Sequence, residues 1–346
     1  MKITRRKFIT YLGITPILGT NYISFSQALS MPLNYAWSAG PELGIPIQEI
    51  YPTVFGGEIF VGGGFVPDVN AIFYGLSPTT KIFIYNPITQ NWRTGSTLPE
   101  ARHHLGMVSN SKYLYGIGGF YGAKGNAWQI KETVFRLTTK NSEWVAGPSL
   151  PIPMAESTYA SIRENIHVVG GKTLDLNSNK NVDVANHFML VDNEKWETAA
   201  PSSVSRNSAA SAVLNEKLFV IGGRKSGKLS KNLGHAEVYN ENTDKWESIA
   251  PLPVSLAGIA ATVLNGKIVV TGGEAFGPNG NWKTGRASQQ VWCYDPIRDS
   301  WKREGDMPEA RHGHGSVTID DAMYIIGGGS KVGPQGTVAS LLVLKK

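Results

Sequence analysis

Two histidine-rich stretches contain the residues of this sequence whose types and spacing first suggest chemistry. Residues 98–106 read LPEARHHLG, and residues 307–315 read MPEARHGHG. Imidazole nitrogens that converge from two segments can ligate zinc or copper, and histidine is also the commonest general acid or base. A repeated structural unit would produce the same similarity, with the histidines marking one repeat position twice. The spacing of the rest of the chain decides between these interpretations.

Apolar, strand-forming runs that end in paired glycines recur along the chain. Their first glycines are separated by 55, 52, 52, 50 and 55 residues. They are Gly63, Gly118, Gly170, Gly222, Gly272 and Gly327. A period near 50 residues is typical of an array of supersecondary units.

A tryptophan precedes each glycine pair by 26 residues. The tryptophans are Trp37, Trp92, Trp144, Trp196, Trp246 and Trp301. The sixth pair has no tryptophan after it, and Trp37 stands near the other end of the array. A circular array has no unpaired edge when a strand from one end completes the sheet at the other end. We therefore expect the segment around Trp37 to be the outer strand of a sheet whose inner strands lie within residues 316–343.

The glycine pairs, the tryptophans and the tyrosines in VYNENTDKW and CYDPIRDSW resemble kelch repeats. The resemblance covers residues 31–346 and implies an all-β fold, a six-bladed β-propeller of four-stranded blades. It also implies that the tryptophans and tyrosines pack the blades together. The paired glycines then serve close strand approach or positive φ rather than phosphate binding.

Three arginines occupy the same repeat position, ten residues after the tryptophan, in alternate blades: Arg102, Arg206 and Arg311. The two PEARH stretches are therefore one repeat position in two blades. The arginines either bond neighbouring backbone carbonyls or converge on the channel mouth as a receptor for a carboxylate or phosphate. Two residues further on, the blades carry Glu49, His104 and Glu156.

The histidine pairs do not predict a metal centre. Adjacent strand residues point to opposite faces, so only one histidine of each pair, His104 with His314, is expected to face one cavity. The sequence has a single cysteine, Cys293, and no paired acidic ligand at a suitable spacing. We expect no metal and no other cofactor.

The first residues resemble a twin-arginine export signal. Arg5 and Arg6 precede an apolar stretch from Phe8 to Leu18, which is too short to span a bilayer. Small residues, Ser26 and Ala28, suggest cleavage after residue 28. We expect residues 1–28 to be the signal and residues 29–346 to be a single exported propeller, periplasmic or extracellular and monomeric.

Charge argues against a nucleic-acid partner. The whole chain has a net charge of +6, but removal of the four basic residues within 1–28 leaves 29 bases against 27 acids, about +2. No basic run or basic-aromatic stripe appears elsewhere.

Two classes of function fit these patterns. The first is a binding module that holds an acidic sugar or glycan, or a protein partner, on the loop face at the channel mouth. Loops 120–128 and 274–286 mix aromatic residues with glycine and asparagine, which suits sugar or peptide recognition. The ligand-binding candidates are Arg102, Arg206, Arg311, Glu49, Arg224 and Trp282.

The second class is a cofactor-free sugar mutarotase. Arg102, Arg311, Met154 and a long loop in the blade of Gly272 resemble bacterial N-acetylneuraminate epimerase. That resemblance implies acid and base groups around a sugar ring. The family's glutamate after the glycines of the fourth blade is Arg224 here, so Glu274, one blade on, is the candidate in its place. Glu156 or His104 is its expected partner.

Overall fold

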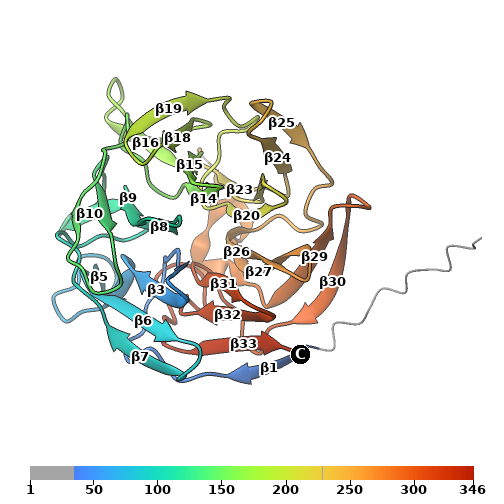
Figure 1. The fold of residues 1–346 in the computed structure, drawn as a ribbon, viewed down its shortest axis with the longest axis horizontal. Coiled ribbons are helices and arrows are strands. Elements are labelled where there is room, and N and C mark those ends of the chain that lie inside the picture. The colour runs from blue at the N-terminus through green and yellow to red at the C-terminus, as the bar shows by residue number, and fades with distance from the viewer. Residues whose placement is uncertain (1–34, 228) are drawn as a thin grey trace, which may run out of the picture. The chain divides into compact units, whose positions relative to one another are not determined.

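Six antiparallel sheets, five of four strands and one of four strands with a short fifth strand at its side, stand around a central axis (Figure 1). The computed structural model describes residues 35–227 and 229–346, so the predicted signal, residues 1–28, lies outside the described residues. The innermost strand of each sheet contacts the innermost strands of both neighbours, and the contacts run around the full circle. The all-β, six-bladed propeller implied by the resemblance to kelch repeats is confirmed.

Each blade is a meander that runs from the axis outward. Blade 1 contains β2 (Thr53–Phe55), β3 (Glu58–Gly62), β6 (Ile82–Asn86) and β7 (Asn91–Thr94). Blade 2 contains β8 (Gly106–Ser109), β9 (Leu114–Ile117), β12 (Val134–Leu137) and β13 (Val145–Ala146). Blade 3 contains β14 (Thr158–Ile162), β15 (Asn165–Val169), β18 (His187–Val191) and β19 (Lys195–Ala199). Blade 4 contains β20 (Ala210–Leu214), β21 (Lys217–Ile221), β24 (Ala236–Asn240) and β25 (Lys245–Ser248). Blade 5 contains β26 (Ala257–Leu264), β27 (Lys267–Ala275), β29 (Gln290–Asp295) and β30 (Ser300–Asp306).

The sixth blade joins segments from both ends of the described chain. It consists of β31 (Gly315–Ile319), β32 (Ala322–Ile326), β33 (Leu341–Lys345) and, outermost, β1 (Ala36–Ala39). Trp37 pairs with Leu344 in this antiparallel ladder. The predicted closure by the strand around Trp37 is confirmed, and Figure 1 shows β1 beside β33.

In five of the six blades the repeat tryptophan forms a hydrogen bond to the chain that follows the preceding blade. The indole Nε1–H of Trp196 donates to the carbonyl of Pro148 at 2.8 Å, and that of Trp246 donates to Ala200 at 2.8 Å. Trp92, Trp144 and Trp301 make the equivalent bonds to Pro41, Ser96 and Ala250. These contacts establish the structural role that the repeat pattern predicted for them.

The hydrophobic core lies between neighbouring blades rather than at the axis. Between blades 2 and 3, for example, Ile117 of β9 packs in one cluster with Val168 of β15 and Leu190 of β18. Such clusters form because each strand alternates its side chains between the two faces of its sheet, and both faces are covered by another blade.

The paired glycines lie where one blade passes under the backbone of the next. Gly118 has φ +57°, and a Cβ there would collide with the carbonyl oxygen of Met154. The following amide, that of Gly119, donates to the same oxygen at 2.9 Å. Only glycine combines this φ with so close an approach.

The segments between the second and third sheet strands form hairpins or loops that rise on one face of the propeller, which we call the loop face. Four of them are two-stranded: β4–β5 (Phe65–Pro67, Leu76–Pro78), β10–β11 (Phe120–Ala123, Asn126–Ile130), β16–β17 (Lys172–Asp175, Lys180–Asp183) and β22–β23 (Arg224–Lys225, Lys231–Asn232). In blade 5 the segment holds the 3-10 helices η1 (Pro278–Gly280) and η2 (Trp282–Thr284) and strand β28 (Arg286–Ala287), which pairs with β27. Within the described ranges, no helix is long and apolar enough to span a membrane.

Candidate functional site

Six residues with left-handed backbone form a ring just inside the loop face. They occupy one repeat position and have φ between 51° and 61°: Glu49, His104, Glu156, Ser208, Gly258 and Gly313. Backbone hydrogen bonds join neighbours around the ring; Gly258 N–H donates to Ser208 at 2.9 Å, and Gly313 N–H donates to Gly258 at 2.9 Å. A left-handed non-glycine residue costs on the order of 1 kcal/mol, and such strain clusters at functional sites. The ring therefore holds its side chains in fixed positions at the axis.

A cavity of about 340 Å³ lies over this ring at the mouth of the channel. The segments before the innermost strands supply Glu49, His104, Glu156, Ser208 and His312, and the inter-strand segments supply Arg224, Glu274 and Trp282. The structure thus brings together six predicted site residues, Glu49, His104, Glu156, Arg224, Glu274 and Trp282, although they come from different blades. A cavity of this size suits a small organic ligand.

Aromatic side chains from three blades form much of the cavity wall. Phe65, Phe73, Tyr74, Trp128, Phe276 and Trp282 all line it. Phe73 and Trp128 meet edge to face at 5.1 Å between ring centroids, and Tyr74 and Trp282 do so at 5.8 Å. Trp128 and Trp282 belong to the two loops in which the sequence suggested ligand-binding aromatics. Their faces offer apolar surface inside an otherwise charged cavity.

A hydrogen-bonded chain leads from the interior of blade 2 to the cavity. His103 Nε2 lies 2.7 Å from the carbonyl of Ala127, His103 Nδ1 lies 2.7 Å from His104 Nδ1, and His104 Nε2 lies 3.0 Å from Glu49 Oε2. A carbonyl only accepts, so His103 Nε2 must carry a proton. Each of the other two contacts also needs one. Three protons on two imidazoles and a carboxyl make the chain neutral overall, and the proton between His104 and Glu49 belongs to one of these two groups.

The electrostatics of these groups agree with this proton count. Burial raises the pKa of the Glu49 carboxyl, but the charge and hydrogen bond of His104 outweigh burial and bring the pKa down to about 2. Burial lowers the pKa of His104, but the Glu49 carboxylate outweighs burial and leaves it above its ordinary value. Burial keeps the pKa of His103 well below its ordinary value. The charged pair is therefore His104 and Glu49.

Replacement of Glu49 by Gln should reverse the pKa shift of His104. The carboxylate that favours the imidazolium is lost while the burial that disfavours it remains, so the pKa of His104 should fall below its ordinary value. NMR titration of the His104 ring protons measures this shift. Glu194→Gln, a change in an exposed turn, is the control and should leave the titration unchanged. An unaltered His104 titration in Glu49→Gln would contradict the proposed pairing.

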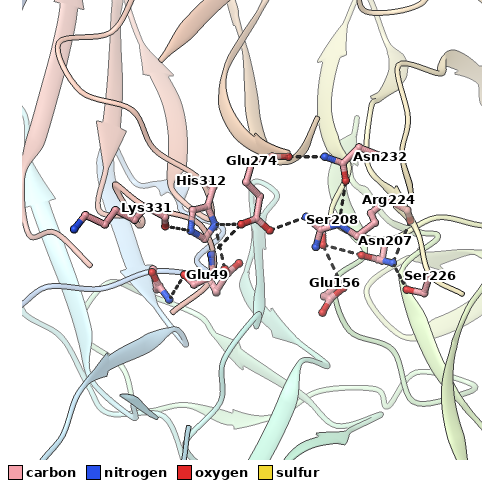
Figure 2. Close-up of polar contacts among 12 residues, drawn as sticks. Glu49, Glu156, Asn207, Ser208, Arg224, Ser226, Asn232, Glu274, His312 and Lys331 are labelled. Carbon is pink, nitrogen blue, oxygen red and sulfur yellow. Dashed lines mark hydrogen bonds and ion pairs between the residues drawn. The ribbon is translucent and has the colours of Figure 1, made fainter. Parts of the chain in front are cut away.

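His312 lies between two carboxylates of the cavity, as Figure 2 shows. Its Nε2–H donates to the carbonyl of Lys331 at 2.8 Å. Its Nδ1 is 3.6 Å from Glu49 Oε1 and 3.6 Å from Glu274 Oε2. A neutral His312 therefore presents a basic nitrogen at the cavity, beside groups able to stabilise its protonated form.

Arg224 is held against the cavity wall. Its guanidinium donates to Glu274 Oε1 at 2.6 Å and to Asn232 Oδ1 at 3.0 Å, and it lies 3.7 Å from the centroid of the Phe276 ring. The other oxygen of Glu274 accepts from the Gly333 amide at 3.0 Å. These contacts fix the Glu274 carboxylate in place and occupy two of the N–H donors of Arg224.

The structure places the three repeat arginines inside the blades, in place of the predicted ring at the channel mouth. Arg102, Arg206 and Arg311 are 0%, 2% and 0% exposed, and they do not line the cavity. Arg311 donates to the carbonyls of Gly327 and Ser340 at 2.9 and 3.1 Å. The first of the two interpretations left open by the sequence, bonding to neighbouring carbonyls, accounts for Arg206 and Arg311. Arg102 is instead held mainly by the side chains of Glu100 and Thr133.

The expected pairing of His104 with His314 is corrected in the same way. His312 faces the cavity with His104, whereas His314 lies on the channel side of the ring and contacts Thr271 Oγ1 at 3.0 Å. The rule that adjacent residues alternate holds in a regular strand. Here left-handed Gly313 separates the two histidines and turns the chain between them. In the described ranges, no group of three or more His, Cys, Asp or Glu side chains could hold a metal ion.

Several residues that line the cavity were not identified from the sequence. They occupy two repeat positions besides the one that holds Glu49, His104 and Glu156. One follows the arginine position and gives Gln48 and His312; the other follows the glycine pair and gives Phe65, as well as the predicted Arg224 and Glu274. These two positions pair with each other across isolated bridges, such as Gln48 with Phe65. Reading both positions around all six repeats would have found these residues.

The fold and cavity define a six-bladed Kelch propeller with a ligand-sized cavity at the loop-face end of its channel. The family described as the KLHDC2/KLHL20/DRC7 Kelch-repeats domain matches residues 156–344, more than half of the chain. The chain belongs to this family.

Similar proteins extend the match beyond these residues. Kelch-like protein terF from Aspergillus terreus is 26% identical over 314 residues, which cover 87% of this chain and 66% of that protein. Beta-scruin from Limulus polyphemus is 26% identical over 171 residues, 49% of this chain and 18% of the scruin. Human Kelch-like protein 15 is 27% identical over 247 residues, 68% of this chain and 39% of the human protein. The chain thus matches less than two thirds of the length of each.

A solved structure, that of YjhT, has the same fold. It superimposes with a TM-score of 0.71 and 17% sequence identity, covering 89% of this chain and 99% of that chain. At this identity the likeness concerns the architecture alone.

Proposed function

We propose that this protein binds a small carbohydrate in the loop-face cavity. The observation that carries the proposal is the combination, in one cavity of about 340 Å³, of aromatic faces with converging carboxylates and imidazoles. Sugar rings present apolar C–H faces that pack on aromatic rings, and their hydroxyls donate to carboxylates. The twin-arginine segment at the N-terminus supports the further proposal that the protein is exported.

The charges of the cavity favour a sugar without a carboxylate. The repeat arginines expected to receive an acidic sugar are buried in the blades, and Arg224 is already bonded to Glu274 at 2.6 Å. An acidic sugar would also meet Glu49, Glu156 and Glu274 at close quarters. We therefore place the acidic sugar second to a neutral or basic one.

Replacement of Trp282 by Ala tests this proposal. Trp282 lies on the cavity wall and is only partly buried, so its removal should weaken sugar binding roughly tenfold while leaving the fold intact. Saturation-transfer NMR with a panel of monosaccharides identifies the ligand, and calorimetry measures its affinity. Trp301→Ala should instead lower thermal stability, because it removes a clamp between blades. The proposal fails if no monosaccharide binds, or if Trp282→Ala leaves the affinity unchanged.

A sugar mutarotase is the second candidate, and the position of His312 favours it. Mutarotation needs a base at the anomeric hydroxyl and an acid at the ring oxygen. His312 Nδ1, with carboxylates of Glu49 and Glu274 each 3.6 Å away, offers the base that takes the proton of the anomeric hydroxyl. The protonated His104 in the same cavity offers the acid that gives a proton to the ring oxygen as the C1–O bond of the ring breaks. Proton NMR of freshly dissolved sugar would show accelerated anomer exchange, and Glu274→Gln should abolish it. Full activity in that variant would remove this candidate.

A protein partner remains a third occupant of the same face. Kelch propellers commonly mediate protein binding, and apolar side chains stand exposed on the loop-face hairpins and loops: Val69, Tyr74, Leu176 and Leu229. If no sugar binds, this rim becomes the surface to test.

A further inference from the structure

The cavity has no surplus positive charge. Its ionisable side chains are Glu49, Glu156, Glu274, His104, His312 and Arg224. Glu49 is paired with His104 at 3.0 Å and Glu274 with Arg224 at 2.6 Å. The third carboxylate, Glu156, has no matching cation among these side chains. A ligand that brings a positive charge therefore suits the cavity better than one that brings a negative charge.

Glu156 is the carboxylate without a cationic partner. It is 8% exposed, and its Oε2 accepts from the Ser208 hydroxyl at 3.2 Å. Within residues 35–227 and 229–346 it makes no ion pair. Burial of a carboxylate is costly unless a donor or cation compensates it. A ligand with a positive charge would supply that compensation.

The Gln48 side chain is a second, independent group whose hydrogen-bonding capacity the protein leaves unfilled. This side chain lines the cavity and is 2% exposed. Its Nε2 donates weakly to Gly333 at 3.4 Å, but among the described residues its Oε1 has no hydrogen-bond partner. An amide oxygen accepts and cannot donate. Two side chains that line the cavity, Gln48 and Glu156, therefore carry buried acceptors whose hydrogen-bonding capacity is not filled, and a ligand with donor groups would compensate them.

The aromatic wall is compatible with a cationic group. Phe73, Trp128 and Trp282 line the same cavity as Glu156. The faces of such rings attract ammonium groups, more strongly where water is excluded. An alkylammonium group is also a triple donor, so one group can reach several acceptors at once.

We propose that the ligand of this cavity is an amino sugar whose protonated amine pairs with Glu156. The proposal rests on the proposed carbohydrate function and narrows its substrate class. The ammonium group donates to the Glu156 carboxylate, a sugar hydroxyl donates to Gln48 Oε1, and the sugar ring packs against the aromatic wall.

Calorimetric titration of residues 29–346 with glucosamine, N-acetylglucosamine and glucose tests the proposal. Glucosamine should bind roughly tenfold or more tightly than either of the others, because only glucosamine forms a charge-assisted hydrogen bond to Glu156. The advantage should disappear as the pH rises through the pKa of the glucosamine amine. Equal affinities for the three sugars, or a preference that does not change with pH, would overturn the proposal.

Glu156→Gln is the matching variant. It keeps the size and the Ser208 contact but removes the charge, so the preference for glucosamine over glucose should collapse. Glu194→Gln, in an exposed turn, is the control and should keep the preference. If Glu156→Gln does not fold, the pH dependence of the unaltered protein still decides the question.

The outcomes separate this inference from the function on which it rests. Binding of glucose and N-acetylglucosamine with no advantage for glucosamine rejects the amino sugar and keeps the carbohydrate site. Absence of binding by all three sugars, together with failure of the wider monosaccharide panel, rejects both.

Discussion

Arg206→Leu should lower the free energy of unfolding by about 3–5 kcal/mol, because it leaves a buried charge without its partner. Arg206 donates to Glu237 Oε1 at 2.6 Å, with the two side chains 2% and 1% exposed. Burial lowers the pKa of Arg206 to about 10, which still keeps the guanidinium charged at neutral pH. The same group donates to the carbonyl of His235 at 2.8 Å, so the loss also leaves a backbone acceptor unpaired. Urea denaturation followed by tryptophan fluorescence measures the change.

Two comparisons show whether burial is the cause. Arg163→Leu breaks an ion pair to Glu216 whose side chains are 48% and 60% exposed, and it should have little effect. The double change Arg206→Met with Glu237→Leu removes both charges and should be more stable than Arg206→Leu alone. Equal losses for Arg163→Leu and Arg206→Leu would contradict the structural role given to the repeat arginines.

Acid should destabilise the propeller from about pH 6.5 downward. Burial lowers the pKa of His167 to about 3, of His187 to about 4 and of His314 to about 3. Below pH 6.5 these histidines take up protons in the unfolded chain but not in the folded one, so their contribution to stability is present above that pH and is lost as the pH falls toward 3–4. Each contributes about 1.4 kcal/mol per pH unit over that window.

Denaturation midpoints and slopes at pH 7.5, 6.5, 5.5 and 4.5 test the acid dependence. His314→Asn removes one of the titrating groups. The number of protons taken up on unfolding should then fall by about one, so the unfolding free energy should change less steeply with pH. His104 acts in the opposite sense because its pKa is raised, so it does not add to the acid loss. Constant stability between pH 6.5 and 4.5 would show that the buried imidazoles are protonated in the folded state.

The circular architecture was predictable because repetition multiplies a weak signal. A single glycine pair or tryptophan says little, but a constant separation of 26 residues fixes which segments form equivalent strands. It also identified the strand of Trp37 as the one that pairs with β33.

The contents of the cavity were predictable only where the repeat position alone decides the direction of the side chain. Glu49, His104 and Glu156 share a position and lie together. Arg102 and its equivalents also share a repeat position. Whether such a guanidinium points to the axis or into its own blade depends on acceptors that are remote in sequence. Examples are Glu237 and the carbonyl of Ser340. The left-handed turn at Gly313 brings His312 rather than His314 to the cavity. The alternation of side chains along a regular strand therefore does not apply to these two histidines.

Because β1 pairs with β33, the sixth blade can be completed only after the last strand of the chain has been synthesised. Strands of the other blades pair within about 50 residues of one another, so each can assemble as the ribosome releases it. Trp37 must wait for Leu344, about 300 residues later. Closing a loop of that length carries an entropic cost of about 5 kcal/mol beyond a constant, but that cost grows only logarithmically with length. The nascent chain therefore carries an open arc with two exposed edges until its last strand emerges, and aggregation during biosynthesis is most dangerous in that interval.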